Sequence, residues 1–279
     1  MQQFQQARRD PSVTVLEGFH AVKHALRFGA ELREAVTTDP AEAARLAAEL
    51  APDVAARLAA AAVVGPEVLA SLGPRAPRTG LMAIAARPVV DVAAVLADPA
   101  DRPIVLLEEP RTMGNLGACV RVAAAAGAAG VLSTGTNDPW HPDVVRGAAG
   151  LHYALPVAHV ELAELTGRGG TVRADVGQEA GADAEQVMRG GQQRDGLAAR
   201  GGRPLVALDP EGEVLDPVTL PQRAVLAFGT ERDGLTDDLL DAADLRIRLP
   251  MQPGVSSLNL ATSVSATLYI WKILSTTAS

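Results

Sequence analysis

Cysteine and aromatic residues are scarce in this chain of 279 residues, and each scarcity excludes a class of protein. A single cysteine, Cys119, rules out a disulfide framework within one chain. Phe, Trp and Tyr together make up 3% of the residues, which argues against a platform on which successive bases of a single-stranded nucleic acid stack. The spacing of Cys and His typical of metal sites is missing, so we predict no bound metal.

Long hydrophobic runs are also missing. The chain has no run of 18 consecutive apolar residues, so the sequence predicts no transmembrane helix and no membrane partner. The first 13 residues, MQQFQQARRDPSV, lack the apolar stretch of a secretory signal. We therefore expect a cytoplasmic protein.

Lysine occurs only at Lys23 and Lys272, so arginine supplies nearly all the positive charge of a chain whose net charge is −8. No lysine stands in a Walker A phosphate-binding motif. Arginine suits bidentate contacts to phosphate, so a local basic face for a nucleic acid is compatible with the acidic whole. The alternative, that these arginines are solvated surface residues, stays open at this point.

What the chain does contain is enough apolar sequence for a full core, since 48% of its residues are hydrophobic. Three prolines interrupt the segment RPVVDVAAVLADPADRP, which is typical of a linker. We predict an N-terminal domain over residues 1–90, a linker over 91–103 and a C-terminal domain over 104–279. The first domain reads as a small α/β unit in which a helix that starts near residue 40 is interrupted at Pro52.

The second domain alternates apolar strands with helices, a pattern that predicts an α/β fold with a mainly parallel sheet. The expected strands are RPIVLLEE, GVLSTG, YALPVAHV, RPLVALDP, RAVLAFG and LRIRLP.

A first motif joins a strand, a polar loop and a helix in IVLLEEPRTMGNLGACVRVAAAAG. Gly114 and Gly117 permit a tight turn into the helix, Asn115 can cap it, and Arg121 falls in its second turn. The alternative is a capped helix with a solvated arginine. The glycines match a dinucleotide fingerprint only loosely, which disfavours a nicotinamide-dependent oxidoreductase.

Two further motifs follow strands near the end of the chain. The strand RAVLAF ends in FGTERDGL, where Gly229 allows close approach of the backbone and Glu231 supplies a carboxylate. The strand LRIRLP ends in a loop that opens into Ser257, Asn259 and an apolar helix. Strand ends of this composition predict a small-molecule site at the carboxyl edge of the sheet. A charged turn and a simple helix cap are the alternatives.

In order, spacing and content, the three motifs resemble those of the SpoU (TrmH) branch of the SPOUT RNA methyltransferases. The segment from Asn115 to Arg121 is similar to the first family motif, GTERDGL through RIRLPM to the second, and Ser257–Asn259 with its helix to the third. The resemblance covers about residues 101–279. The N-terminal part is similar to the substrate-binding domain of this family, a small ribosomal-protein fold that binds RNA.

This resemblance implies a catalytic domain with a trefoil knot, bound S-adenosylmethionine, a homodimer and methyl transfer to a ribose 2′-OH of RNA. The cofactor residues that it implies are Ser133, Leu208, Gly229, Leu249, Pro250 and Leu258. The catalytic residues that it implies are Asn115, Arg121, Glu231, Ser257 and Asn259, with Arg121 at the reacting oxygen. Arg146 is a further candidate for a contact with RNA phosphate.

Three positions depart from the family pattern and leave the substrate contacts open. Ser256 stands where Glu is frequent, Ala148 where Ser is common, and Glu109 before Pro110 where Asp is more usual. Ribosomal RNA is the favoured substrate because of the N-terminal domain, and transfer RNA is the alternative. Resistance to a ribosome-targeting antibiotic is a possibility within the ribosomal case. A non-catalytic RNA-binding module with the same fold is the alternative from another class.

The last helix gives an expectation about assembly. Leu260, Val264, Leu268 and Trp271 recur at helical spacing and form an apolar stripe near the chain end. We expect this stripe to pack in a subunit interface or beneath it.

Overall fold

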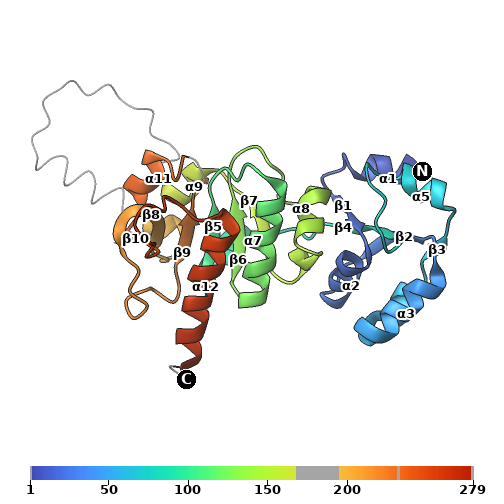
Figure 1. Ribbon diagram of the computed structural model, residues 1–279. Coiled ribbons are helices and arrows are strands. Elements are labelled where there is room, and N and C mark those ends of the chain that lie inside the picture. The colour runs from blue at the N-terminus through green and yellow to red at the C-terminus, as the bar shows by residue number, and fades with distance from the viewer. Residues whose placement is uncertain (1, 168–194, 231–232, 278–279) are drawn as a thin grey trace, which may run out of the picture. The chain divides into compact units, whose positions relative to one another are not determined.

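The computed structural model describes residues 2–167, 195–230 and 233–277 (Figure 1). These residues form two compact units. The first unit comprises Met1–Val90, Thr112–Ala124 and Asp138–Val157, and the second comprises Asp91–Arg111, Ala125–Asn137 and Ala158–Ser279. Because neither unit is continuous in the sequence, the division at residues 90 and 103 stays a prediction.

The first unit is built on a four-stranded sheet of order β1-β4-β2-β3. Its strands are β1 (Val13–Glu17), β2 (Leu32–Thr37), β3 (Ala62–Val63) and β4 (Leu81–Ala86). The long pairs β1–β4 and β2–β4 are antiparallel, and the short β3 pairs parallel to β2. A core that includes Phe4, Val15, Leu72 and Met82 lies against this sheet.

Several helices of the first unit begin at a proline or at a side-chain cap. Its helices are α1 (Gln2–Ala7), α2 (Phe19–Arg27), α3 (Pro40–Leu50), η1 (Pro52–Val54), α4 (Ala55–Leu58), α5 (Pro66–Ser71), α8 (Pro142–Gly147) and η2 (Leu151–Tyr153). Asp39 caps α3 by accepting the backbone N–H of Glu42 at 2.9 Å, and Pro40 follows it at the first helical position. The predicted interruption at Pro52 is confirmed, because α3 ends at Leu50 and a separate 3-10 turn begins at Pro52.

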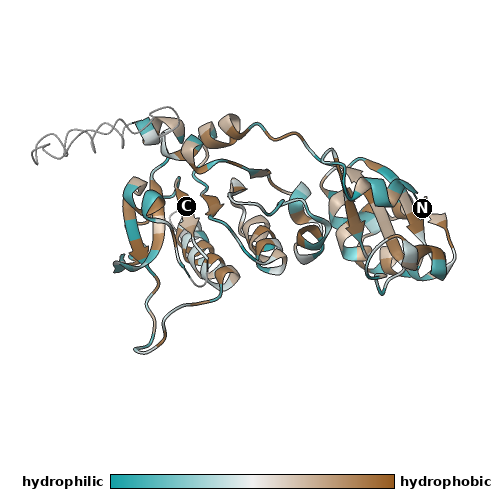
Figure 2. Ribbon diagram, turned by 90° about the horizontal axis from the view of Figure 1, so that it is seen from above, coloured by the Kyte–Doolittle hydropathy of each residue, from teal (hydrophilic) through white to brown (hydrophobic). Residues whose placement is uncertain are grey.

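The second unit carries the mainly parallel sheet that the sequence predicts, with strand order β10-β8-β9-β5-β6-β7. Its strands are β5 (Ile104–Leu107), β6 (Gly130–Ser133), β7 (Val157–His159), β8 (Leu205–Val214), β9 (Val225–Phe228) and β10 (Leu245–Arg248). All four residues of β5 and all four of β9 are hydrophobic and buried, as expected of central strands that are covered on both faces (Figure 2).

The remaining helices are α6 (Val92–Ala97), α7 (Met113–Ala126), α9 (Leu162–Thr166), α11 (Asp237–Ala242) and α12 (Leu260–Thr277). Leu96 on α6, Leu165 on α9 and Leu239 on α11 join the strands in one buried core. Across the described parts of the chain, every helix is too short or too polar to cross a bilayer.

One strand differs from its predicted extent. Strand β8 was expected to end near Pro210 but continues to Val214. Ala207 pairs with Arg246, and the next pair on β10 is formed by Glu213, so residues 208–212 leave the ladder as a large bulge. The bulge accommodates Pro210, which has no N–H to donate to a neighbouring strand.

Candidate cofactor pocket at the carboxyl edge of the sheet

A pocket lies where β8, β9 and β10 end, and its empty space, part of it open to solvent, is about 640 Å³. Strands β8 and β9 finish side by side, with Leu208 paired to Phe228 in parallel register. The residues that line the pocket are Leu208, Asp209, Pro210, Phe228, Gly229, Thr230, Gly234, Ile247, Arg248, Leu249, Met251, Ser257, Leu258, Leu260 and Ser263. Most of its side chains are apolar, with a few polar groups, as is usual for sites that bind small molecules.

Five of the predicted site residues are brought together here: Leu208, Gly229, Leu249, Ser257 and Leu258. They come from three segments of the chain that are up to 50 residues apart in sequence. Sequence reasoning missed Asp209, Thr230, Ile247, Arg248, Met251 and Ser263. Their only signal was adjacency to a strand end or to the first turn of a helix.

Gly229 is required by the loop that follows β9. A Cβ atom at this position would lie 2.1 Å from the backbone carbon and oxygen of Gly234. Thr230 and Gly234 exchange two backbone hydrogen bonds of 3.1 Å, so the loop folds back directly over Gly229. The close approach that the sequence predicted is therefore, in this structure, an approach of the chain to itself.

The same loop is fixed from its other side. Glu108, buried at the end of β5, accepts the backbone N–H of Thr236 at 2.8 Å and its hydroxyl at 2.6 Å. Arg111 forms an ion pair with Asp233. A second hollow borders this loop, lined among others by Glu109, Arg111 and Asp237, and it shares Thr230 and Gly234 with the pocket. Glu231 lies outside the described residues.

Asn259 ends the loop that closes the pocket. Its side-chain oxygen accepts the backbone N–H groups of Ala261 at 3.0 Å and Thr262 at 3.4 Å, so it caps α12. Asn259 and Pro250 are not among the residues that line the pocket. Ser133, at the end of β6, is fully buried, and its hydroxyl has no hydrogen-bond partner among the described residues.

Asn115 and Arg121 lie on α7 in the first unit. The expectation that Asn115 caps this helix is wrong: α7 already begins at Met113, and the hydroxyl of Thr112 accepts the N–H of Asn115 at 3.4 Å. Arg121 is exposed. The pKa of His20 is lowered by burial of its ring and then by the charges of Lys23 and Arg121, which places Arg121 near the first turn of α2.

The two glycines of the first motif also lie inside α7 rather than in a turn before it. A Cβ atom on Gly117 would lie 2.4 Å from the carbonyl oxygen of Val144 and 2.9 Å from the Cα atom of Gly147. Gly117 is therefore needed for close packing of α7 against α8, whereas Gly114 has open space around it.

Arg146 was predicted to contact RNA phosphate and has protein partners in this structure. Its guanidinium donates to the buried Glu17 at 2.5 Å and pairs with Asp143 at 2.5 Å. Glu17 also accepts from Arg8 at 2.5 Å. The carboxylate thus joins β1 to α8 and to the segment after α1.

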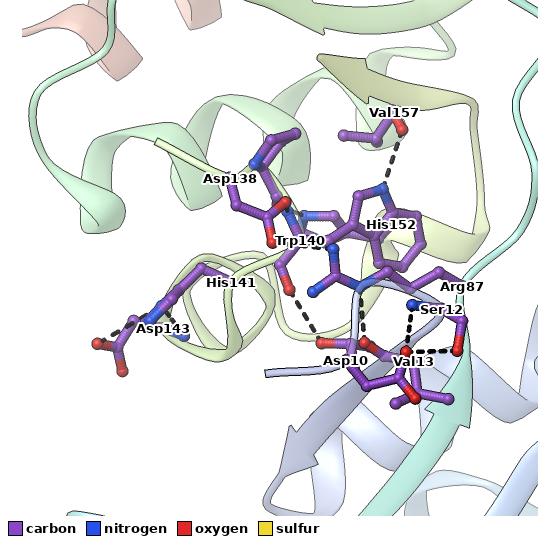
Figure 3. Close-up of polar contacts among 12 residues, drawn as sticks. Asp10, Ser12, Val13, Arg87, Asp138, Trp140, His141, Asp143, His152 and Val157 are labelled. Atoms are coloured by element: carbon purple, nitrogen blue, oxygen red, sulfur yellow. Dashed lines mark hydrogen bonds and ion pairs between the residues drawn. The ribbon is translucent and has the colours of Figure 1, made fainter. Parts of the chain in front are cut away.

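A partly buried polar cluster holds the segment from Asp138 to Val157 against β1 and β4 (Figure 3). Arg87 donates to the carbonyl of Val13 at 2.7 Å and to Asp138 at 2.8 Å. The indole of Trp140 donates to the carbonyl of Val157 at 2.9 Å and stacks at a tilt on His152. Burial lowers the pKa of His152 to about 4, so its ring is neutral at pH 7 and serves the core. The described residues bring no three His, Cys, Asp or Glu side chains together as a metal site.

A parallel sheet with a small-molecule pocket at its carboxyl edge defines the class of α/β proteins that bind nucleotide-like ligands. Within this class, the chain belongs to the SpoU rRNA Methylase family, whose sequence signature matches residues 102–171 and 171–269.

Individual relatives agree with this membership. An uncharacterized tRNA/rRNA methyltransferase of Synechocystis is 27% identical over 94% of this chain and 84% of its own length. A 23S rRNA uridine 2′-O-methyltransferase of Streptomyces viridochromogenes is 30% identical over 65% of this chain, a match that spans 58% of that protein. The crystal structure of the SpoU methyltransferase AviRb from Streptomyces viridochromogenes in complex with AdoMet has the same fold. Its TM-score is 0.70, with 23% identity and 98% of both chains covered.

Proposed function

We propose that this protein transfers a methyl group from S-adenosylmethionine to a ribose 2′-OH of ribosomal RNA. The observation that carries the proposal is the pocket at the ends of β8, β9 and β10, in a chain that belongs to the SpoU rRNA methylase family. The pocket fits the cofactor, because apolar walls such as Phe228 and Leu258 suit adenine and backbone groups at strand ends suit its polar edge.

The cofactor supplies a methyl group on a sulfonium, which is already activated for transfer. The protein has to align the 2′-oxygen in line and assist removal of its proton. Arg121 is assigned to this task. Because a guanidinium stays protonated at accessible pH, Arg121 acts by fixing the RNA phosphate and the oxygen while water or that phosphate takes the proton.

The other assigned residues hold the site in place. Ser257 lines the pocket and orients the ribose or the methionine end of the cofactor. Asn259 fixes the start of α12 through its cap and thereby the loop that carries Ser257. Asn115, nearly two helical turns before Arg121, orients Arg121 or the ribose, and Glu231 fixes the loop after β9. Ser133, Leu249 and Pro250 complete the cofactor site.

The N-terminal part of the chain is proposed to bind the RNA, and the predicted trefoil knot to lie around the pocket. Arg75 and Arg78 are exposed in the loop before β4, where they are available for phosphate contacts. We also propose that the enzyme acts in the cytoplasm.

The function is tested by mapping ribose 2′-O-methyl groups in RNA from cells with and without the gene. We expect one or a few positions of ribosomal RNA to lose the modification, and purified protein to restore it with labelled S-adenosylmethionine. Loss confined to transfer RNA would overturn the choice of substrate. Tight binding of the cofactor without methylation of any RNA would favour the non-catalytic RNA-binding module, and binding of NAD instead would favour an oxidoreductase.

A homodimer is also proposed. The apolar stripe of α12 was expected to lie in the interface or beneath it, and its burial within a single chain is compatible only with a place beneath it. Leu260, Val264, Leu268 and Trp271 of α12 are at most 4% exposed in a single chain. Tyr269 and Ile273 of the same helix are 44% and 62% exposed. The exposed side chains of Tyr269 and Ile273 form the apolar surface that supports self-association.

We expect the wild type to sediment as a dimer at micromolar concentration and Ile273→Glu to sediment as a monomer, because a charge in the interface would be desolvated without a partner. Val218→Glu is the matched control, since Val218 is 87% exposed elsewhere in the second unit. A monomeric wild type would contradict the dimer, and a dimeric Ile273→Glu variant would exclude this face.

A further inference from the structure

Among the described residues that line the pocket, Asp209 supplies the one carboxylate, and the walls around it are largely apolar. The side chain of Asp209 is 11% exposed. Its Oδ1 atom accepts the backbone N–H of Glu211 at 3.0 Å in a local turn. Its Oδ2 atom is 4.0 Å from Nη1 of Arg246, at the outer limit of an ion pair. One carboxylate oxygen is therefore used by the local turn, and the other has, among the described residues, only a distant partner.

The position of Asp209 is built into the sheet. Leu208 pairs with Phe228 at the end of β9, so Asp209 is the first residue of β8 beyond that pair. The chain rejoins β10 only four residues later, where Glu213 pairs with Ile247. A Cβ atom on Gly212 would lie 2.6 Å from the backbone of Arg246 and Ile247, so the return of the bulge is tightly packed.

Arg246 sets the charge beside this carboxylate, and Arg248 contacts the bulge that carries it. Arg246 is held on α11 by the carbonyl of Leu240 at 3.1 Å and by Asp241 at 3.6 Å. Arg248, which lines the pocket, donates to the carbonyl of Gly212 at 3.1 Å. With the Arg246 guanidinium already near this carboxylate, a further cation is disfavoured and a neutral donor of hydrogen bonds is favoured. A neutral hydroxyl also costs less to desolvate than an ammonium group.

We propose that Asp209 binds the ribose diol of the cofactor, with Oδ2 accepting hydrogen bonds from the 2′- and 3′-hydroxyls of its adenosine. The inference rests on the proposed function, because it presupposes that the pocket holds S-adenosylmethionine. An acidic side chain just beyond a strand end, beside the pocket of a parallel sheet, is a general solution for recognising ribose hydroxyls. Asp209 thereby makes the pocket selective for an intact ribonucleoside.

The test is calorimetric titration of the full-length protein with three probes: S-adenosylhomocysteine, 5′-methylthioadenosine and the 2′,3′-dideoxy form of 5′-methylthioadenosine. 5′-Methylthioadenosine keeps the diol but lacks the amino acid. Asp209→Asn removes the charge and keeps an oxygen for the N–H of Glu211, and Asp209→Ser is a second variant with a shorter acceptor. Asp216→Asn is the matched control, because Asp216 accepts the N–H of Val218 in a similar turn outside the pocket.

We expect Asp209→Asn to weaken S-adenosylhomocysteine and 5′-methylthioadenosine by the same factor, about 10- to 100-fold, as for a hydrogen bond to a charged group. The wild type should bind the dideoxy probe more weakly than 5′-methylthioadenosine by a similar factor. Asp209→Asn, which has already lost the interaction with the diol, should bind these two probes with nearly equal affinity. Asp216→Asn should bind all probes within twofold of wild type. A loss restricted to S-adenosylhomocysteine would assign Asp209 to the ammonium group and overturn the proposal. Wild-type affinity in both folded Asp209 variants would overturn it as well. A wild type that binds none of the probes would instead refute the proposed function, and this inference with it.

Discussion

Arg121→Ala is expected to lower the rate of methyl transfer by about 10²- to 10⁴-fold while leaving the affinity for S-adenosylmethionine within a few-fold of wild type. Arg121 is exposed on α7 in the first unit, whereas all residues that line the cofactor pocket belong to the second. If its guanidinium fixes the reacting oxygen and phosphate only in the transition state, its loss should change turnover and not binding of the cofactor.

Single-turnover transfer to ribosomal RNA, with cofactor affinity measured separately by calorimetry, separates the two effects. Arg121→Lys should recover little activity, because a point ammonium does not reproduce the planar fork of a guanidinium. Arg45→Ala is the matched control, since Arg45 is also exposed and, within the part of the chain that the structure describes, pairs with Glu42 and Glu49 of its own helix. Near wild-type turnover in Arg121→Ala would show that Arg121 is only a solvated surface residue. A large loss of cofactor affinity in Arg121→Ala would show instead that the first motif belongs to the cofactor site.

Arg203→Ala is expected to lower the free energy of unfolding by about 3 kcal/mol. Arg203 is fully buried and donates to the backbone carbonyls of Leu96, Arg102 and Asp98 at 2.9, 2.7 and 2.8 Å. Burial lowers the pKa of this guanidinium, and its three hydrogen bonds offset the cost of holding the charge inside. Truncation would leave a cavity and remove charged donors from the end of α6.

Urea unfolding of Arg203→Ala, of Arg223→Ala and of the double variant checks this expectation. Arg223 also donates to the carbonyls of Leu96 and Asp98, at 3.2 and 2.8 Å, so it retains two of the three acceptors when Arg203 is removed. Arg203→Ala/Arg223→Ala should therefore cost more than the sum of the single changes. Arg102→Ala serves as the control, because its ion pair with Asp98 is largely exposed and is worth less than about 1 kcal/mol. A loss below about 1 kcal/mol in Arg203→Ala would show that the bonds of Arg203 are replaced by water.

Much of the fold and pocket could be predicted because the decisive signals are local. Apolar runs such as IVLL and VLAF are short and uninterrupted, which indicates buried parallel strands. Proline interrupts a helix, as Pro52 does here, because it has no N–H to donate. A Gly or Ser that follows such a strand marks the carboxyl edge of the sheet. For these reasons the residues themselves indicate that Gly229 and Ser257 lie at one edge of the sheet, whereas Leu249 is a site residue only through the resemblance to the SpoU family.

Contacts between distant parts of the chain could not be predicted in this way. Arg146 pairs with Glu17, 129 positions away, and so holds a strand where the sequence suggested a free phosphate contact. Gly117 was assigned to a turn, yet it lies within α7, where a glycine is needed because α8 packs close to its Cα. The apolar stripe of α12 that includes Leu268 faces the core of its own chain.

By itself, the sequence therefore determined the α/β class, the parallel sheet, the family and the strand ends that carry the pocket. Only the tertiary structure decided that residues 138–157 join the N-terminal strands, that β8 bulges to carry Asp209 into the pocket, and which arginines are buried. The physical reason is that periodicity and turn chemistry depend on neighbours along the chain. The partner of a charged group or a glycine depends on which surfaces meet when the chain folds.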